Sequence, residues 1–143
     1  MKTTTELPVK KNKGANITAW ILQILLGGMF IMTGAMKTFT PIEQLAASLP
    51  WAADVPATLV KFIGLAELLG GLGLILPSLL KIKTKLTPIA AIGIVLIMVF
   101  ASIFHISRGE TGVIGMNLIL AALAGVVAWL RLKKAPLRDK NAK

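Results

Sequence analysis

The chain alternates long apolar stretches with short polar and basic ones, and this pattern predicts four membrane-spanning helices. The apolar stretches cover residues 17–37, 57–76, 86–106 and 113–130. Each is long enough to cross the hydrocarbon core of a bilayer as an α-helix. We therefore predict an all-α fold in which residues 17–130 form a four-transmembrane-helix bundle, flanked by basic tails at 1–16 and 131–143.

Turn-forming residues refine these boundaries. Proline at positions 56 and 77 predicts that the second span begins at residue 57 and ends at 76. Thr87 is expected to cap the third span, with Pro88 in its first turn. In the loop of residues 38–56, the apolar positions between Pro41 and Leu49 share one helical face. This predicts a short helix at the membrane interface.

The basic residues indicate the orientation of the bundle. The chain has 16 Lys and Arg against six acidic residues, a net charge of +10. Most of the basic residues lie in the two tails, among them Lys2, Lys10 and Lys11, and in the loop between the second and third spans. Because cytoplasmic loops are enriched in Lys and Arg, we expect both termini in the cytoplasm. The charge then contacts anionic lipid and does not indicate nucleic-acid binding.

Two further features limit the class of protein. The first apolar stretch has the basic flank of a signal peptide, but it is longer than the apolar region of such peptides, so we expect it to be retained as a span. The chain has no cysteine and one histidine. Thiolate metal sites, iron-sulfur clusters and a bis-histidine haem within one subunit are therefore excluded, and we predict no metal site.

Glu67 is the main candidate for a functional group. It lies near the middle of the second span, where a carboxyl group is costly unless it faces the bundle interior. Gly64, Gly70 and Gly71 share its helical face and leave room for either a neighbouring helix or a ligand head group. Lys61 is six residues away and not positioned to pair with Glu67 directly. Glu67 should therefore be protonated or paired with another helix.

The other spans place further polar residues at similar depth. Gln23, Phe30 and Lys37 repeat every seven residues with Thr33 beside them, so this face of the first span should turn inward. Lys37 is either an interfacial anchor or a site residue. His105 is a proton acceptor, a ligand contact or a hydrogen-bonded interfacial residue.

The fourth span contributes an amide and a face of small residues. Asn117 either binds a ligand or bonds across helices. Ala121 and Gly125 belong to a face suited to close helix packing. Most of the polar residues of the spans fall in the outer half, whereas we expect the inner half to contain little besides Gln23. This asymmetry predicts a polar pocket that opens outward above Glu67, and its candidate ligand-binding residues are Thr33, Lys37, Lys61, Glu67, His105 and Asn117.

Several motifs together resemble a known family. GAMKTF ends the first span, LPW precedes the second, GLAELLGGLGLILP lies within it, FHISRGE ends the third, and an asparagine lies in the fourth. In this order they resemble the DoxX-like family of small four-helix integral membrane proteins. The resemblance covers about residues 17–131. It implies that Lys37, Glu67, His105 and Asn117 match the family's polar signature.

The resemblance also implies a function and a location. Family members are associated with terminal quinol oxidase and thiosulfate:quinone oxidoreductase, so we expect a quinone- or amphiphile-binding subunit of a redox system in the bacterial cytoplasmic (inner) membrane. Glu67 is the best candidate for a proton-carrying residue, and the expected partners are lipid and a redox subunit. Further copies of the chain, in a homo-oligomer, are another candidate partner. The alternative functions are a non-catalytic accessory or assembly protein and a small-solute transporter, although no inverted repeat supports the last.

Overall fold

The computed structural model describes residues 12–142, and four long apolar helices dominate it. They are α1 (Lys13–Phe39), α3 (Ala57–Leu80), α4 (Leu86–Ser107) and α5 (Ile114–Trp129). The described part contains no strand. The predicted four-span, all-α fold is therefore confirmed. The predicted basic tail at 1–16, with Lys2, Lys10 and Lys11, falls mostly outside the described residues.

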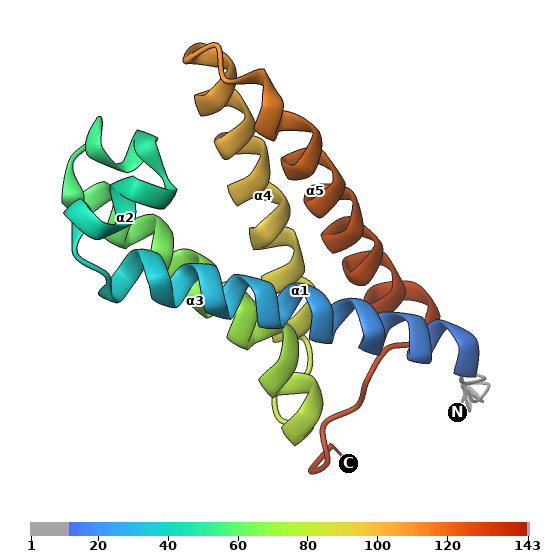
Figure 1. The fold of residues 1–143 in the computed structure, drawn as a ribbon. Helices are drawn as coiled ribbons and strands as arrows, with labels where there is room; N and C mark the ends of the chain where they lie inside the picture. Colours follow the sequence, from blue (N-terminus) through green and yellow to red (C-terminus); the bar gives the residue numbers. More distant parts are fainter. Residues whose placement is uncertain (1–11, 143) are drawn as a thin grey trace, which may run out of the picture.

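The four helices form two pairs whose axes are steeply inclined to each other (Figure 1). α1 packs along α3, α4 packs along α5, and α3 contacts α4 to join the pairs. The main core lies where the pairs meet. Its fully or almost fully buried side chains are Leu26, Phe30, Leu74, Ala91, Ile94, Met98, Ala124, Val127 and Ala128.

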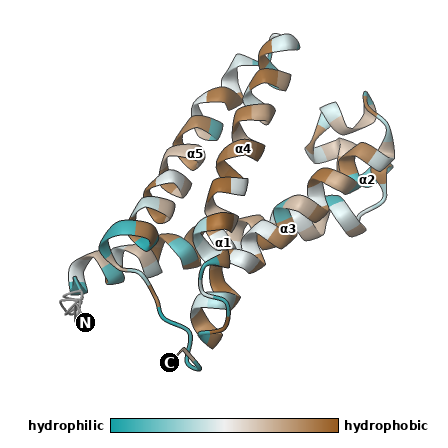
Figure 2. Ribbon diagram, turned by 180° about the vertical axis from the view of Figure 1, so that it is seen from behind, coloured by the Kyte–Doolittle hydropathy of each residue, from teal (hydrophilic) through white to brown (hydrophobic). Residues whose placement is uncertain are grey.

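Hydrophobic residues run along the length of all four helices (Figure 2), and many of their side chains are exposed. Phe62 on α3 and Phe100 on α4 are each 68% exposed, and many leucines and isoleucines are similarly open. Exposed apolar surface on this scale is expected where lipid replaces water around the helices. The chain is a multi-pass membrane protein that contacts the bilayer along all four helices.

We call the end that carries α2 and the α4–α5 turn the loop end. Here α2 (Ile42–Ser48) and the 3₁₀ turn η1 (Pro50–Ala53) follow α1, as the amphipathic pattern predicted. Leu45, Ala52 and Val60 form a small core beneath them. A second 3₁₀ turn, η2 (Thr111–Val113), leads into α5. The opposite end carries the first and last residues of the described chain, Asn12 and Ala142, and is the terminal end.

Three predicted boundaries were wrong. α1 begins at Lys13, because the Asn12 side chain accepts a hydrogen bond from the Ala15 N–H and caps the helix. α3 does not end before Pro77 but continues to Leu80, and the Ser78 hydroxyl in this extra turn bonds Thr87 on α4. Lys85 precedes α4, so Thr87 lies inside the first turn and is not the N-cap.

The last span also differs from its prediction. The helical path continues beyond Trp129 into a π-helical turn, η3 (Leu130–Lys134). Its defining bond joins the Ala135 N–H to the Leu130 carbonyl at 2.7 Å. Arg131, predicted to belong to the C-terminal tail, follows the buried Ala128 by three residues and Ala124 by seven. The continued helical path therefore keeps it on the inward face, and it is buried in the protein.

Glycine allows α1 and α3 to approach closely. A Cβ at Gly64 would lie 2.6 Å from Lys37 Cβ, and one at Gly71 would lie 2.8 Å from the Gly27 carbonyl oxygen. Gly34 on α1 faces the backbone of Leu68 in the same way. Backbone contact of this kind requires positions without side chains.

The other predicted packing positions behave differently from one another. Gly70 lies against α4, where an added Cβ would be 3.1 Å from Ile94 Cγ1. Ala121 packs against the main core. A Cβ at Gly125 would meet no atom within 4 Å, so the close packing expected at Gly125 does not occur within the described chain. The reason is that Ala124 and Val127, and not Gly125, occupy the inward face of α5.

Candidate functional site

A buried ion pair lies between α1 and α3 toward the loop end. Glu67 is 3% exposed, and the Lys37 Nζ donates to both of its carboxylate oxygens, at 2.7 and 2.9 Å. The Thr33 hydroxyl, one turn before Lys37, donates to Glu67 at 3.3 Å. We call Thr33, Lys37 and Glu67 the loop-end cluster. Glu67 therefore has its partner on another helix, one of the two arrangements that the sequence allowed.

The close helix contact explains why Lys37 reaches Glu67. Gly64 lies one turn before Glu67 and accommodates the Lys37 stem against the α3 backbone. The lysine is only 13% exposed, so most of its side chain is also removed from solvent. An ion pair in surroundings of low dielectric constant is held strongly once formed, and separating it leaves a costly unpaired charge.

An aromatic group lies between the loop-end cluster and α4. The Lys37 Nζ is 5.8 Å from the centre of the Trp51 ring in η1. Trp51 in turn makes edge-to-face contacts with Phe104 and His105 near the end of α4, at centroid distances of 5.7 and 6.3 Å. Such edge-to-face geometry is favourable between aromatic rings. Trp51 therefore connects the ion pair to His105.

His105 begins a chain of charged contacts across the loop end. Its Nδ1 lies 2.6 Å from a Glu110 oxygen, and Arg108 donates both to Glu110 at 2.9 Å and to Asp54 at 2.7 Å. The hydrogen bonds from His105 and Arg108 lower the pKa of Glu110, and those to Asp54 and Glu110 raise the pKa of Arg108. The two groups are thus held in their charged forms. This chain ties the α2–η1 region to the α4–α5 turn.

The remaining predicted site residues are not part of the loop-end cluster. Lys61 is exposed, as expected of a lysine that extends toward the membrane surface. Asn117 on α5 is half-buried, and its Nδ2 is buried without a hydrogen-bond partner in the described chain. An unpaired buried amide donor is costly and marks a position where a ligand acceptor would be favourable.

The prediction that the other half of the bundle holds little besides Gln23 was wrong. Gln23 is fully buried, donates to Ser78 at 3.1 Å and to the Leu74 carbonyl, and accepts from the Arg131 Nε at 2.6 Å. Ser78 bonds Thr87 at 2.8 Å. The Arg131 Nη1 donates to Asn16 at 2.7 Å. We call this group the terminal-end cluster, and its members are Asn16, Gln23, Ser78, Thr87 and Arg131.

Most members of the terminal-end cluster lie at or next to the ends of the predicted spans, where polar residues are usually exposed. These members are Asn16, Ser78, Thr87 and Arg131. Gln23 was placed correctly on the inward stripe with Phe30. The inward position of Gln23 could have indicated further polar residues nearby, because a buried amide needs both hydrogen-bond donors and acceptors around it.

The side-chain groups of the two clusters indicate which kinds of molecule each could bind. Among residues 12–142, no three His, Asp or Glu side chains form a group that suits a metal ion. At the loop end, Lys37 and the unpaired Asn117 amide are hydrogen-bond donors suited to a neutral carbonyl ligand. At the terminal end, the guanidinium of Arg131 is suited to an anion.

Comparison with protein families gives one match. A family model described as the DoxX-like family matches residues 21–127, which include α3, α4 and most of α1 and α5. The matched region contains the whole loop-end cluster and ends before Arg131. Comparisons with curated proteins and with solved structures gave no significant match.

Proposed function

Since the chain belongs to the DoxX-like family, we propose that it is a membrane subunit that binds a quinone or a similar amphiphile beside the loop-end cluster. The observation that carries this proposal is the Lys37–Glu67 ion pair, buried between two apolar helices. Ionisable residues at this depth are costly and by default indicate a functional site. The aromatic rings of Trp51 and Phe104 provide a flat apolar surface next to it.

The polar groups of the site fit a quinone head group. A quinone has two carbonyl acceptors and needs hydrogen-bond donors on both sides of its ring. Lys37 has three N–H donors and gives two of them to Glu67, which leaves one for a ligand. Outside the loop-end cluster, Asn117 on α5 has a further unpaired donor in its Nδ2. The isoprenoid tail would then lie along the apolar helix surfaces.

Proton transfer is the part of quinone chemistry that this chain can support. Reduction of a quinone to a quinol takes up two electrons and two protons. The Lys37–Glu67 pair can hold and pass a proton within hydrogen-bond distance, as general acid–base catalysis requires. The chain has no cysteine and a single histidine, so we propose that a partner subunit of the membrane redox system supplies the electrons.

The charge distribution supports an orientation for this subunit. The terminal end carries Lys13, the basic residues of the C-terminal segment, and the α3–α4 turn with Lys81, Lys83 and Lys85. By the positive-inside rule this end faces the cytoplasm, in the cytoplasmic membrane of a bacterium. The quinone site then lies in the outer half of the membrane.

An accessory or assembly role is the second candidate. It is favoured by one observation: both Glu67 oxygens already accept hydrogen bonds within the chain. Such a pair can fix the register of α1 against α3 without any ligand. In that case Glu67 would affect folding and partner assembly but not the content of any bound molecule.

The distinguishing experiment is extraction in a mild detergent followed by mass spectrometry of co-purified lipophilic molecules. Wild type is compared with Glu67→Gln, which keeps the shape of the side chain but cannot carry a charge, and with Glu43→Gln at an exposed position on α2. We expect about one quinone per chain in wild type and Glu43→Gln and its loss in Glu67→Gln. A folded wild-type protein without any such molecule would reject the quinone site and favour the accessory role.

A further inference from the structure

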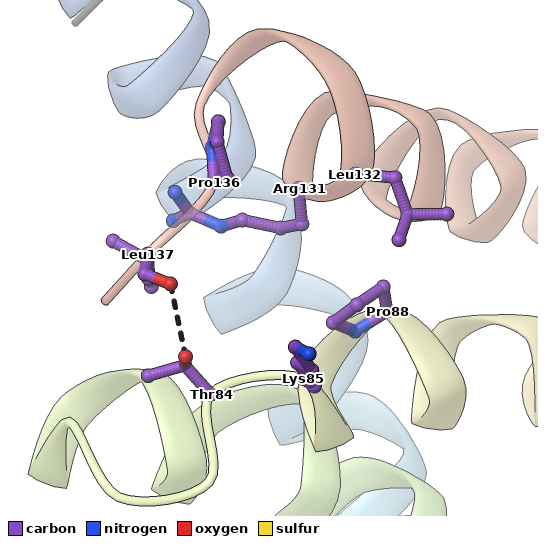
Figure 3. Close-up of a pocket in the computed structure, with 7 residues that line it drawn as sticks. All are labelled: Thr84, Lys85, Pro88, Arg131, Leu132, Pro136 and Leu137. Carbon is purple, nitrogen blue, oxygen red and sulfur yellow. Dashed lines mark hydrogen bonds between the residues drawn. The ribbon is translucent and has the colours of Figure 1, made fainter. Parts of the chain in front are cut away.

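A cavity at the terminal end lies outside the site proposed above. It has a volume of about 180 Å³ and lies between the start of α4, the π turn after α5 and the C-terminal segment (Figure 3). It is lined by Thr84, Lys85, Pro88, Arg131, Leu132, Pro136 and Leu137. Since about 10 to 15 Å³ is enough for one water, the cavity has room for a polar group of several heavy atoms.

Arg131 is the buried charge of this cavity. It is 4% exposed, and its side chain extends under the C-terminal segment beside Pro136 (Figure 3). Its Nε and Nη1 donate to Gln23, Asn16 and the Ala135 carbonyl, all of them neutral acceptors. Its Nη2 is buried and has no partner. Within residues 12–142, no ion pair includes Arg131.

A guanidinium in this state requires an anion. Burying a cation without a counter-charge is costly, and a buried N–H without an acceptor adds to that cost. Phosphate oxygens accept strong, charge-assisted hydrogen bonds from the N–H groups of arginine. Nε and Nη1 already donate to protein acceptors, so Nη2 is the nitrogen left to donate to one ligand oxygen.

Lys85 provides a second cation at the opening. It lines the cavity and is exposed, so its ammonium group can move toward a bound anion without leaving solvent. Asp139 does not line the cavity; it accepts hydrogen bonds from Thr84, and the charge of Lys85 contributes to the lowering of its pKa. The charges that face the cavity are therefore both positive.

The rest of the lining is apolar and adjoins the lipid-facing surface. Pro88, Leu132, Pro136 and Leu137 lie around the two cations. Leu132 is 54% exposed, and Ile89 on the next turn of α4 is 59% exposed. A basic pocket at the end of a helix bundle, open toward acyl chains, fits a lipid with an anionic head group. We propose that this cavity binds the phosphate of an anionic phospholipid, with Arg131 and Lys85 as its ligands.

Binding can be measured on the full-length protein in neutral detergent, independently of any quinone. Native mass spectrometry and thermal unfolding are followed while dioleoylphosphatidylglycerol, dioleoylphosphatidylcholine or inorganic phosphate is added. Lys85→Gln is the main variant, because Lys85 is exposed and its loss should not prevent folding. Lys133→Gln, an exposed lysine on the π turn outside the cavity, is the matched control. Arg131→Lys keeps the charge but removes the guanidinium group and its free Nη2.

We expect one tightly bound phosphatidylglycerol per chain and a higher unfolding temperature with this lipid than with phosphatidylcholine. Lys85→Gln should weaken binding about tenfold, as loss of a charged hydrogen bond does, and Arg131→Lys should weaken it further. Lys133→Gln should change it less than about twofold. Saturable binding of inorganic phosphate with equal stabilisation would reject the lipid and assign the site to free phosphate. If the two lysine variants weakened lipid binding equally, or if the two lipids bound and stabilised the protein equally, the proposed site would be rejected.

Discussion

The two polar clusters of this bundle neutralise charge in different ways. In the loop-end cluster, the Glu67 carboxylate and the Lys37 ammonium lie on neighbouring helices and cancel each other. In the terminal-end cluster, Arg131 is held by the neutral side chains of Gln23 and Asn16, and no carboxylate of the described chain pairs with it. The loop-end cluster has no net charge, whereas the terminal-end cluster has a net positive charge.

This difference explains why we propose a different ligand for each cluster. A neutral ion pair does not attract an ion, but its spare N–H donor can bind a carbonyl group. A guanidinium without a counter-ion attracts a phosphate. The clusters also join different elements: the loop-end cluster joins α1 to α3, and the terminal-end cluster joins α1, α3, α4 and the turn after α5.

The largest expected effect on stability comes from replacing one partner of the Lys37–Glu67 ion pair. Glu67→Leu leaves the Lys37 ammonium buried and unpaired, and should lower the free energy of unfolding by about 3 to 5 kcal/mol. In the double variant Lys37→Met, Glu67→Leu, no charge remains, and most of this loss should be recovered. Equilibrium unfolding with SDS in mixed micelles measures both. If the two substitutions were simply additive, the pair would not be the coupled unit that the geometry indicates.

The next effect concerns the close contact that brings the ion pair together. Gly34→Leu introduces a side chain against the Leu68 backbone and should destabilise the protein by about 1 to 3 kcal/mol. Gly28→Leu is its matched control on the same helix, because an added Cβ there meets nothing within 4 Å. Thermal unfolding in detergent compares them. Equal stability of the two variants would show that α1 and α3 can separate without cost.

The residues of the loop-end cluster could be predicted from the sequence, because charged residues within apolar spans are easily recognised. A glutamate and a lysine in apolar spans must be accommodated, and seven-residue spacing placed Lys37 on the same inward face as Gln23. The number of spans and the short helix after Pro41 followed from hydrophobic patterning for the same reason. What the pattern did not specify was whether Glu67 is protonated or paired, since that depends on which helix packs against α3.

The terminal-end cluster was missed because its residues lie at the ends of spans. Arg131 was assigned to a solvated tail, but the helical path continues past Trp129 and keeps Arg131 on the inward face of α5, seven residues after Ala124, where it reaches Gln23. The apolar stretch that defined the span ends at Leu130, so the pattern gave no reason to extend the helix. Ser78 follows a proline that was expected to end the helix, yet the helix continues by one turn. Contacts between residues this far apart in sequence depend on tertiary packing and not on local preference.

A smaller effect tests the neutral part of the terminal-end cluster. Gln23→Leu removes the acceptor for the Arg131 Nε and the donor for Ser78, and should cost about 1 to 2 kcal/mol, at the upper end for polar contacts between membrane helices. Gln44→Leu on the exposed face of α2 serves as the control. Unfolding with SDS gives the difference. If Gln23→Leu lowered the free energy of unfolding as much as Glu67→Leu does, Gln23 alone would account for the stabilisation of the buried Arg131. An anion would then not be needed to stabilise it.

The smallest effect concerns the C-terminal segment that covers the cavity. Asp139 accepts hydrogen bonds from the Thr84 N–H and hydroxyl, both at 2.8 Å, and these bonds lower its pKa in the folded protein. A carboxyl group with a lowered folded-state pKa stabilises the fold at pH values above its unfolded pKa, about 3.9. That contribution is lost as the pH falls through the folded-state value.

The segment should therefore remain in place from neutral pH down to about pH 4, near the unfolded pKa of aspartate, and loosen in stronger acid. Hydrogen exchange at the Thr84 amide, corrected for the intrinsic pH dependence of exchange, measures this loosening directly. Asp139→Asn keeps an oxygen acceptor for Thr84 but cannot titrate, so its protection should be weaker than that of wild type at neutral pH and constant in acid. The same acid-dependent loss in Asp139→Asn would assign the effect to another group and separate the Asp139 contact from the stability of the cavity.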